Sequence, residues 1–260
     1  MISTIEAGAA PTTPSASPKA ASASARTPVR VVDVWLLDLQ QSTVGLDAVL
    51  EAAERERAEF LCTAALRRRF VVRRAARRHI LGGYLGVAPE QLRFSQGPNC
   101  KPQPVTHEPL QMSCSHREEL GVVAVCADAA VGVDVEALHL NVGPSSEELD
   151  PLAQVMMSPV ERADFRALPA ALRRTALLTT WTRKEAVVKG LGVGLSLPLD
   201  TFDVPVDPGT PPRLLARRGA ARDGQQWSMS GLTLPSGYVG TVTAQGSDCR
   251  ARIRSWETHR

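Results

Sequence analysis

The chain has 260 residues, of which 43% are hydrophobic and 22% charged, with a formal net charge of +3. This composition excludes a fibrous or wholly disordered protein, and the length predicts one or two globular domains. The longest apolar run ends at Asp128 and is far shorter than the roughly 20 residues of a membrane span. We therefore expect a soluble protein with no membrane partner.

Cysteine usage indicates the cellular compartment. The chain has five cysteines, and none of them forms a Cys-x-x-Cys pair or lies at zinc-ligand spacing from a histidine. Neither a disulfide framework nor a structural zinc site is supported. We therefore expect a cytoplasmic protein.

Positive charge is concentrated between residues 51 and 80. This segment holds nine Arg and four Glu, a local balance of +5, so the rest of the chain sums to −2. Seven of the arginines fall between Arg67 and Arg78 and surround a helical wheel, which argues against membrane binding through one basic face. Several are expected to be solvated, whereas one or two are expected to reach a phosphate, which Arg binds in a bidentate manner.

The predicted elements begin after an N-terminal tail over residues 1–28, which is rich in Ala, Ser, Thr and Pro and is expected to be disordered. A buried strand is predicted from Val29 onward, and helices are predicted over about 46–61 and 66–85, the second ending near Gly86. Short strands are then expected at 92–95, 110–114, 121–127 and 131–136.

The second half repeats this order in outline, with helices first. Ser158 and Glu161 form a capping box around Pro159, which predicts the start of a helix. A long helix is predicted over about 170–190. Strands are then expected at 201–206, 226–234 and 237–244.

This pattern predicts an α+β fold made of two similar α+β lobes. The first lobe is expected over residues 29–129 and the second over 130–250. The tails 1–28 and 251–260 would lie outside both lobes.

Two motifs contain the residues expected to carry chemistry. Asp134 and Glu136 alternate with valines in a strand-like run, so both carboxylates project from one face. Glu185 and Lys189 are four residues apart on the long predicted helix and share a face, one turn after Trp181. Each motif alone is typical of a solvated surface. If the three carboxylates converge, a hard cation such as magnesium relieves their repulsion, because no His or Cys accompanies them.

Several familiar catalytic motifs are absent from the sequence. There is no P-loop and no Gly-x-Ser-x-Gly nucleophile elbow, and the glycine-rich run 190–194 follows a predicted helix where a Rossmann fingerprint would precede one. An enzyme with this sequence is therefore not expected to supply a covalent nucleophile.

Gly132–Glu136, followed about 45 residues later by Trp181–Lys189, resembles the two signature motifs of the Sfp-type 4′-phosphopantetheinyl transferases. The similarity extends to 194–200, Cys100–Pro102 and Ser115–His116. The resemblance implies a monomeric enzyme that moves the phosphopantetheine arm of coenzyme A onto a serine of an apo acyl or peptidyl carrier protein and releases adenosine 3′,5′-bisphosphate. It also implies a pseudo-two-fold arrangement of the lobes, with the active site at their interface.

The resemblance further implies roles for individual residues. Asp134, Glu136 and Glu185 would hold Mg²⁺, and Glu185 would also act as general base for the incoming serine. Lys189 would neutralise charge on the transferring phosphoryl group. Contacts with coenzyme A are expected from Arg57, Arg69, Lys101, His116, Lys184 and Lys189.

Two alternatives stay open at this point. An Arg-rich helix also fits a nucleic-acid-binding protein, although the near-neutral remainder and the scarcity of aromatic residues count against it. A degenerate family member would bind coenzyme A without transferring its arm. Cys100, Ser113 and Arg117 depart from the residues usual in the family and are the only indication of that case.

Overall fold

A computed structural model of the chain describes residues 29–96, 101–138, 148–219 and 224–257, so the tail predicted over 1–28 lies outside the described residues. The first part contains β1 (Arg30–Asp38), η1 (Leu46–Val49), α1 (Ala52–Glu59), α2 (Ala64–Leu85), η2 (Pro89–Gln91), β2 (Phe94–Gln96), β3 (Pro102–Pro104), β4 (Gln111–Arg117) and β5 (Leu120–Cys126). The second part contains β6 (Val131–Ala137), α3 (Leu149–Met156), α4 (Pro159–Ala167), α5 (Ala170–Leu191), η4 (Gly194–Ser196), η5 (Leu199–Thr201), β7 (Phe202–Asp203), β8 (Ala216–Arg217), β9 (Trp227–Gly231), β10 (Tyr238–Gln245) and β11 (Cys249–Trp256). The mixed α+β class predicted from the sequence is confirmed.

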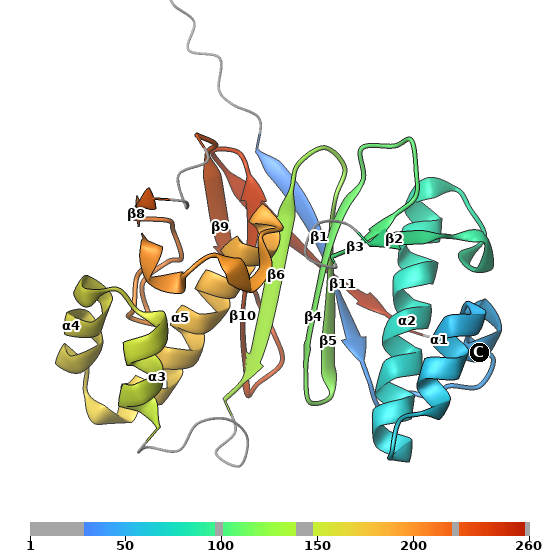
Figure 1. Ribbon diagram of the computed structural model, residues 1–260, viewed down its shortest axis with the longest axis horizontal. Helices are drawn as coiled ribbons and strands as arrows, with labels where there is room; N and C mark the ends of the chain where they lie inside the picture. Colours follow the sequence, from blue (N-terminus) through green and yellow to red (C-terminus); the bar gives the residue numbers. More distant parts are fainter. Residues whose placement is uncertain (1–28, 97–100, 139–147, 220–223, 258–260) are drawn as a thin grey trace, which may run out of the picture.

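Two sheets form the centre of the molecule, with α2 on one side and α5 on the other (Figure 1). The first sheet has the strand order β11-β1-β5-β4, and the second has the order β6-β10-β9. β1 and β11 are parallel, whereas the other neighbours in these two sheets are antiparallel.

Alternation along each strand builds two core layers around the first sheet. Val32 and Val34 of β1 pack against Val133 and Val135 of β6, in a cluster that fills the space between the two sheets. The opposite face of β1 and β5 packs against the apolar face of α2, where Val72 and other aliphatic side chains are buried. Because strand side chains alternate in direction, the same strands supply both layers.

Two glycines let α5 lie close to the second sheet. A Cβ atom on Gly132 of β6 would come within 1.9 Å of the Ala186 carbonyl oxygen and 2.4 Å of the Gly190 nitrogen. A Cβ atom on Gly190 would come within 2.8 Å of the Trp227 ring. Glycine at these two positions therefore allows α5, with Glu185 and Lys189, to lie close to β6, with Asp134 and Glu136.

Capping residues set the ends of several helices close to the predicted positions. The Thr63 side chain caps α2, and the left-handed Gly86 ends it. The capping box of Ser158 and Glu161 starts α4, as expected. The helix predicted over 46–61 is instead divided, because Leu50 is extended and Glu51 starts α1 with a second capping box.

The prediction that residues 251–260 form a tail is wrong. Residues 249–256 form β11, which pairs with β1 from Arg30 to Leu37. Asp33 of β1 binds Arg252 and Arg254 of β11, so opposite charges join the two strands. The chain thus returns from the second sheet to the first before it ends.

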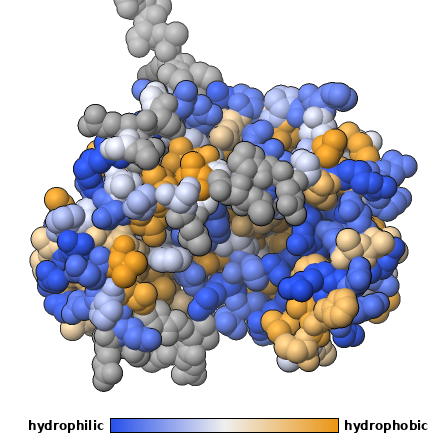
Figure 2. Space-filling view, in the orientation of Figure 1, coloured by the Kyte–Doolittle hydropathy of each residue, from blue (hydrophilic) through white to orange (hydrophobic). Residues whose placement is uncertain are grey.

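Polar residues cover most of the face shown in Figure 2, and the apolar residues there form separate patches. Among the described residues, no helix is both long enough and apolar enough to cross a bilayer.

Candidate active site

A cavity of about 460 Å³ lies where α2, β4 and the C-terminal half of α5 approach one another. Three arginines of α2 line it, and Glu185 and Lys189 of α5 line it as well. The other lining residues are Leu37, Lys101, Pro102, Met112, Ser113, Cys114, Ser115, His116, Val122, Val123, Val188, Gly192 and Gly194. The cavity therefore joins residues from both halves of the chain.

β4 is an edge strand, and its alternate side chains serve different parts of the site. Ser113 accepts a hydrogen bond from the Val133 nitrogen, and Ser115 bonds Asp134, so both serines face β6. His116 contacts Arg73 of α2 instead. Adjacent residues of a strand point in opposite directions, which explains how one Ser-His dipeptide serves two sides of the cavity.

Ser115, Asp134 and Lys189 form a cluster that joins β4, β6 and α5. The Ser115 hydroxyl donates to Asp134 Oδ1 over 2.7 Å, and Lys189 Nζ donates to the same oxygen over 2.7 Å. Lys189 Nζ also lies 3.1 Å from Ser115 Oγ. The cluster fixes the side chain of Lys189 at the cavity wall and leaves Asp134 Oδ2 buried without a hydrogen-bond partner.

Glu185 contributes a second carboxylate oxygen that lacks a partner. Its Oε1 atom is buried without a hydrogen bond, and its pKa is raised by burial and by the charge of Asp134, with Lys189 opposing. Two unpartnered carboxylate oxygens of like charge suit a hard cation. Within the described residues, however, no three His, Cys, Asp or Glu side chains already form a metal-binding group.

Glu136 is the third expected carboxylate, and like Asp134 it is not among the residues that line the cavity. Arg117 Nε lies 3.2 Å from Glu136 Oε2 in an ion pair. Burial raises the pKa of Glu136, and the Arg117 charge opposes that rise. Arg117, noted in the sequence only as a departure from the family pattern, therefore neutralises this carboxylate.

The arginines that line the cavity are Arg73, Arg74 and Arg77, and the sequence pattern assigns no individual role to any of them. Arg77 is almost fully buried, donates to Glu54 over 3.0 Å, and stacks 3.9 Å from the centre of the Phe94 ring. Desolvation lowers the pKa of Arg77 to about 10, so the group stays cationic at neutral pH. A helical wheel gave no means of choosing these arginines, because the whole helix is ringed by arginine.

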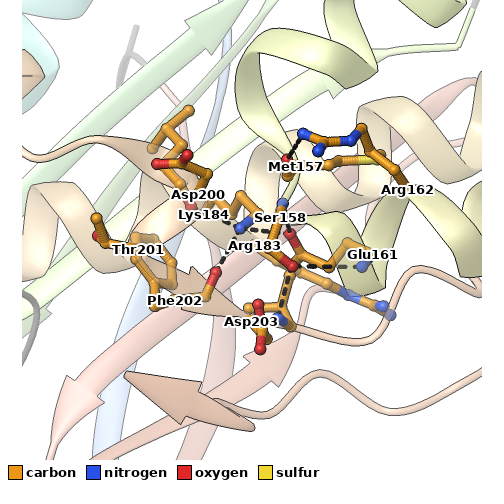
Figure 3. A network of polar contacts seen from close by, with 12 residues as sticks. Met157, Ser158, Glu161, Arg162, Arg183, Lys184, Asp200, Thr201, Phe202 and Asp203 are labelled. Atoms are coloured by element: carbon orange, nitrogen blue, oxygen red, sulfur yellow. Dashed lines mark hydrogen bonds and ion pairs between the residues drawn. The ribbon is translucent and has the colours of Figure 1, made fainter. Parts of the chain in front are cut away.

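The expected contact between Lys184 and coenzyme A is wrong, because this side chain is fully buried in a separate network (Figure 3). Lys184 Nζ lies 2.8 Å from Glu161 Oε2 and donates to the carbonyl oxygens of Leu199 and Phe202. Glu161 also accepts from the backbone nitrogens of Ser158 and Val204. This network joins α4, α5 and β7, and Lys184 does not line the cavity.

The structure separates the two arginines that the resemblance assigned to coenzyme A. Arg57 is exposed on α1 and does not line the cavity, so its contact with coenzyme A stays a prediction. Arg69 lies beside the site, since its charge contributes to the lowered pKa of His116, but it pairs with Glu118 and Glu119 at 3.7 and 3.9 Å and does not line the cavity.

Lys101 and His116, two of the residues expected to contact coenzyme A, both line the cavity. Lys101 Nζ also donates to the carbonyl oxygens of Val131 and Lys189 over 3.1 and 2.8 Å. Burial lowers the pKa of Lys101 to about 8, and the nearby Lys189 charge adds to this effect. Lys101, directly before β3, therefore joins the first residue of β6 to the C-terminal end of α5.

Comparison with known proteins agrees with the motifs. A family model described as the 4′-phosphopantetheinyl transferase superfamily matches residues 130–243. The 4′-phosphopantetheinyl transferase HetI of Nostoc sp. is 30% identical over 221 residues, which cover 83% of this chain and 88% of that protein. A 4′-phosphopantetheinyl transferase of Bacillus subtilis is 28% identical over 62% of this chain and 74% of its own length. The 4′-phosphopantetheinyl transferase psf-1 of Bacillus pumilus is 29% identical over 58% of this chain and 60% of its own length.

Proposed function

This chain belongs to the 4′-phosphopantetheinyl transferase superfamily, and we propose that it transfers the phosphopantetheine arm of coenzyme A to a serine of an apo acyl or peptidyl carrier protein. The observation that carries this proposal is the cavity, where Glu185 and Lys189 of α5 face the arginines of α2. Coenzyme A has a pyrophosphate and a 3′-phosphate, so its site needs cations on more than one wall.

The proposed reaction is a phosphoryl transfer without a covalent enzyme intermediate. The serine Oγ of the carrier attacks the phosphorus that bears the phosphopantetheine arm, and the bond from that phosphorus to the bridging oxygen of the pyrophosphate breaks. Adenosine 3′,5′-bisphosphate leaves with the electron pair, and the serine proton goes to a base. Positioning and charge neutralisation account for most of the catalysis of such transfers.

Glu185 is the base in this proposal, and Lys189 is the cation beside the transferring group. Burial raises the pKa of Glu185, which makes the carboxylate a better proton acceptor than a solvated one. Lys189 is held by Asp134 and Ser115, so its ammonium group is already oriented when substrate arrives. The preorganised charge lowers the barrier as negative charge shifts toward the leaving group.

The proposal includes a magnesium ion, because the carboxylates of Asp134 and Glu185 suit one. Asp134 Oδ2 and Glu185 Oε1 are buried and unpartnered, and carboxylate oxygens are the ligands that Mg²⁺ prefers. Glu136 would join them after release from Arg117. The ion would supply charge neutralisation to the pyrophosphate.

The proposal includes a two-lobe organisation of the Sfp type. The lobes would be residues 29–129 and 130–250 in a pseudo-two-fold arrangement, with the active site at their interface and with β11 returned to the first sheet. In this proposal the enzyme is a cytoplasmic monomer, and its arginines serve coenzyme A and not nucleic acid. The ion pairs of Arg77 and Arg78 with Glu54 support that assignment, because they remove both side chains from the helix surface.

The test is a mass measurement on carrier proteins. Purified protein is incubated with coenzyme A, Mg²⁺ and apo carriers from fatty-acid, polyketide and nonribosomal peptide pathways. We expect at least one carrier to gain the mass of one phosphopantetheine group. We expect Asp134→Ala to abolish this gain, whereas Asp164→Ala, which removes an exposed carboxylate on α4, should retain it.

Three results would contradict the proposal. If no carrier gains mass while the protein binds coenzyme A, the chain is a binding protein of this superfamily without transferase activity. Full activity of Asp134→Ala would remove the proposed metal site. Displacement of coenzyme A by DNA or RNA in a salt-dependent manner would favour a nucleic-acid-binding function.

A further inference from the structure

The geometry points to Arg73 as a positioning residue that fixes His116 as a neutral imidazole with its proton on Nε2. This inference deepens the proposed function and rests on it only for the identity of the ligand. It assigns to Arg73 a task different from simple contact with a phosphate, and it explains how a histidine can serve a strongly basic cavity.

Arg73 and His116 meet across the cavity from different elements. Arg73 Nη1, from α2, lies 3.0 Å from His116 Nδ1 on β4. Arg73 Nε donates to the carbonyl oxygen of Arg69 over 3.1 Å, one helical turn earlier. The guanidinium group of Arg73 is therefore held at both ends. Arg73 and His116 both line the cavity.

The chemistry of the two groups fixes the position of the proton. An arginine side chain has only donors and stays charged at ordinary pH. His116 Nδ1 must therefore accept in this bond, and a neutral ring with an accepting Nδ1 has its proton on Nε2. A protonated ring would place two N–H groups against each other and would lose the bond.

The charges around His116 act in the same direction. Arg73 and Arg69 face the ring from α2, Lys189 faces it from α5, and Arg117 is its neighbour on β4. Glu118 and Glu119 lie nearby but are paired with Arg69. Burial and these four cations lower the pKa of His116 to about 4.

The two residues are expected to bind one anionic group of the ligand in different ways. His116 donates a hydrogen bond from a neutral N–H group, and Arg73 supplies the positive charge. A neutral donor does not add another repelling cation to Arg73, Arg74 and Arg77 in the empty cavity. Binding through this pair is expected to be insensitive to the titration of histidine between about pH 5 and pH 8.

The experiment combines histidine NMR with kinetics on the full chain. In ¹⁵N-histidine spectra, with the His116→Asn variant to assign the signal, we expect the wild-type His116 signal to show the Nε2–H tautomer and no titration between pH 5 and pH 8. In Arg73→Leu, we expect the midpoint to rise by at least about one pH unit. Arg73→Lys keeps the charge and a donor and should restore the wild-type behaviour. Arg68→Leu, an exposed arginine on the same helix, is the matched control and should change nothing.

The kinetic arm measures KM for coenzyme A against pH. At pH 8 we expect Arg73→Leu to raise KM about tenfold, the usual effect of losing a charged hydrogen bond. This KM should fall toward acidic pH as His116 gains its charge, whereas the wild-type KM should show no such change.

A wild-type His116 that titrates near pH 6.5, or an Nδ1–H tautomer, would overturn the inference. So would an Arg73→Leu variant with an unchanged midpoint. The NMR arm needs no turnover, so it separates failure of this inference from failure of the proposed function.

Discussion

Lys184 and Lys189 lie five residues apart on α5, and their surroundings differ completely. The Lys184 side chain is 0% exposed, and its ammonium group bonds Glu161 and two backbone carbonyls. The Lys189 side chain is 30% exposed and reaches Asp134 and Ser115 at the cavity. One lysine joins α5 to its neighbours, and the other supplies charge to the site.

This difference shows how one helix can contribute both to the core and to the wall of the cavity. Five residues correspond to about 140° of rotation beyond one full turn, so the two side chains leave α5 in different directions. Lys184 enters the layer formed by α4 and β7 (Figure 3), whereas Lys189 enters the space between the two halves. Glu185, next to Lys184 in sequence, also lines the cavity.

Lys184→Met should have the largest effect on folding. It leaves the buried Glu161 carboxylate without its cation, and we expect the free energy of unfolding to fall by about 3–5 kcal/mol in urea titrations. The double variant Glu161→Gln with Lys184→Met removes the unpaired charge and should recover part of this loss. If the double variant is no more stable than Lys184→Met, the ion pair does not explain the stability of this layer.

Lys189→Met should instead affect the rate of transfer more than the stability of the fold. We expect kcat to fall by about 10²–10³-fold, because a preorganised charge beside the transferring group is lost. The free energy of unfolding should fall by less than in Lys184→Met, because Lys189 is partly exposed and Asp134 keeps its bond to Ser115. Equal kcat in Lys189→Met and wild type would place the catalytic charge elsewhere.

Gly132→Ala tests the close contact between β6 and α5, the helix that carries Glu185 and Lys189. The new Cβ would lie 1.9 Å from the Ala186 carbonyl oxygen, so α5 must move. We expect a loss of about 1–3 kcal/mol in the free energy of unfolding, together with a lower kcat. Gly83→Ala on α2 is the control, because nothing lies within 4 Å of its Cβ position, and it should gain roughly 0.5–1 kcal/mol. Similar stability of the two variants would contradict the role given to Gly132.

The sequence predicted much of the fold where local signals were strong. Gly86 ends α2, and the Ser158 capping box starts α4. β11 was missed because its alternating arginines are typical of a solvated tail. Those arginines become intelligible only beside Asp33 of β1, more than 200 residues earlier in the chain.

The cavity collects only some of the residues that the motifs indicated. Glu185, Lys189, Lys101 and His116 line it, whereas Asp134, Glu136, Arg57, Arg69 and Lys184 do not. Helical spacing indicates which residues share a face, but it does not indicate which face another element covers. Arg77 was overlooked for that reason, although Phe94 and Glu54 hold it at the cavity.

By itself, the sequence determined the α+β class, the family and the carboxylate and lysine motifs, because periodicity, caps and motif spacing are properties of neighbouring residues. The tertiary structure decided which charges meet. Ser115, Asp134 and Lys189 come from three elements, and Arg73 and His116 come from two. Their pairing depends on the packing of α2 and α5 against opposite sides of the two sheets, which no local pattern specifies.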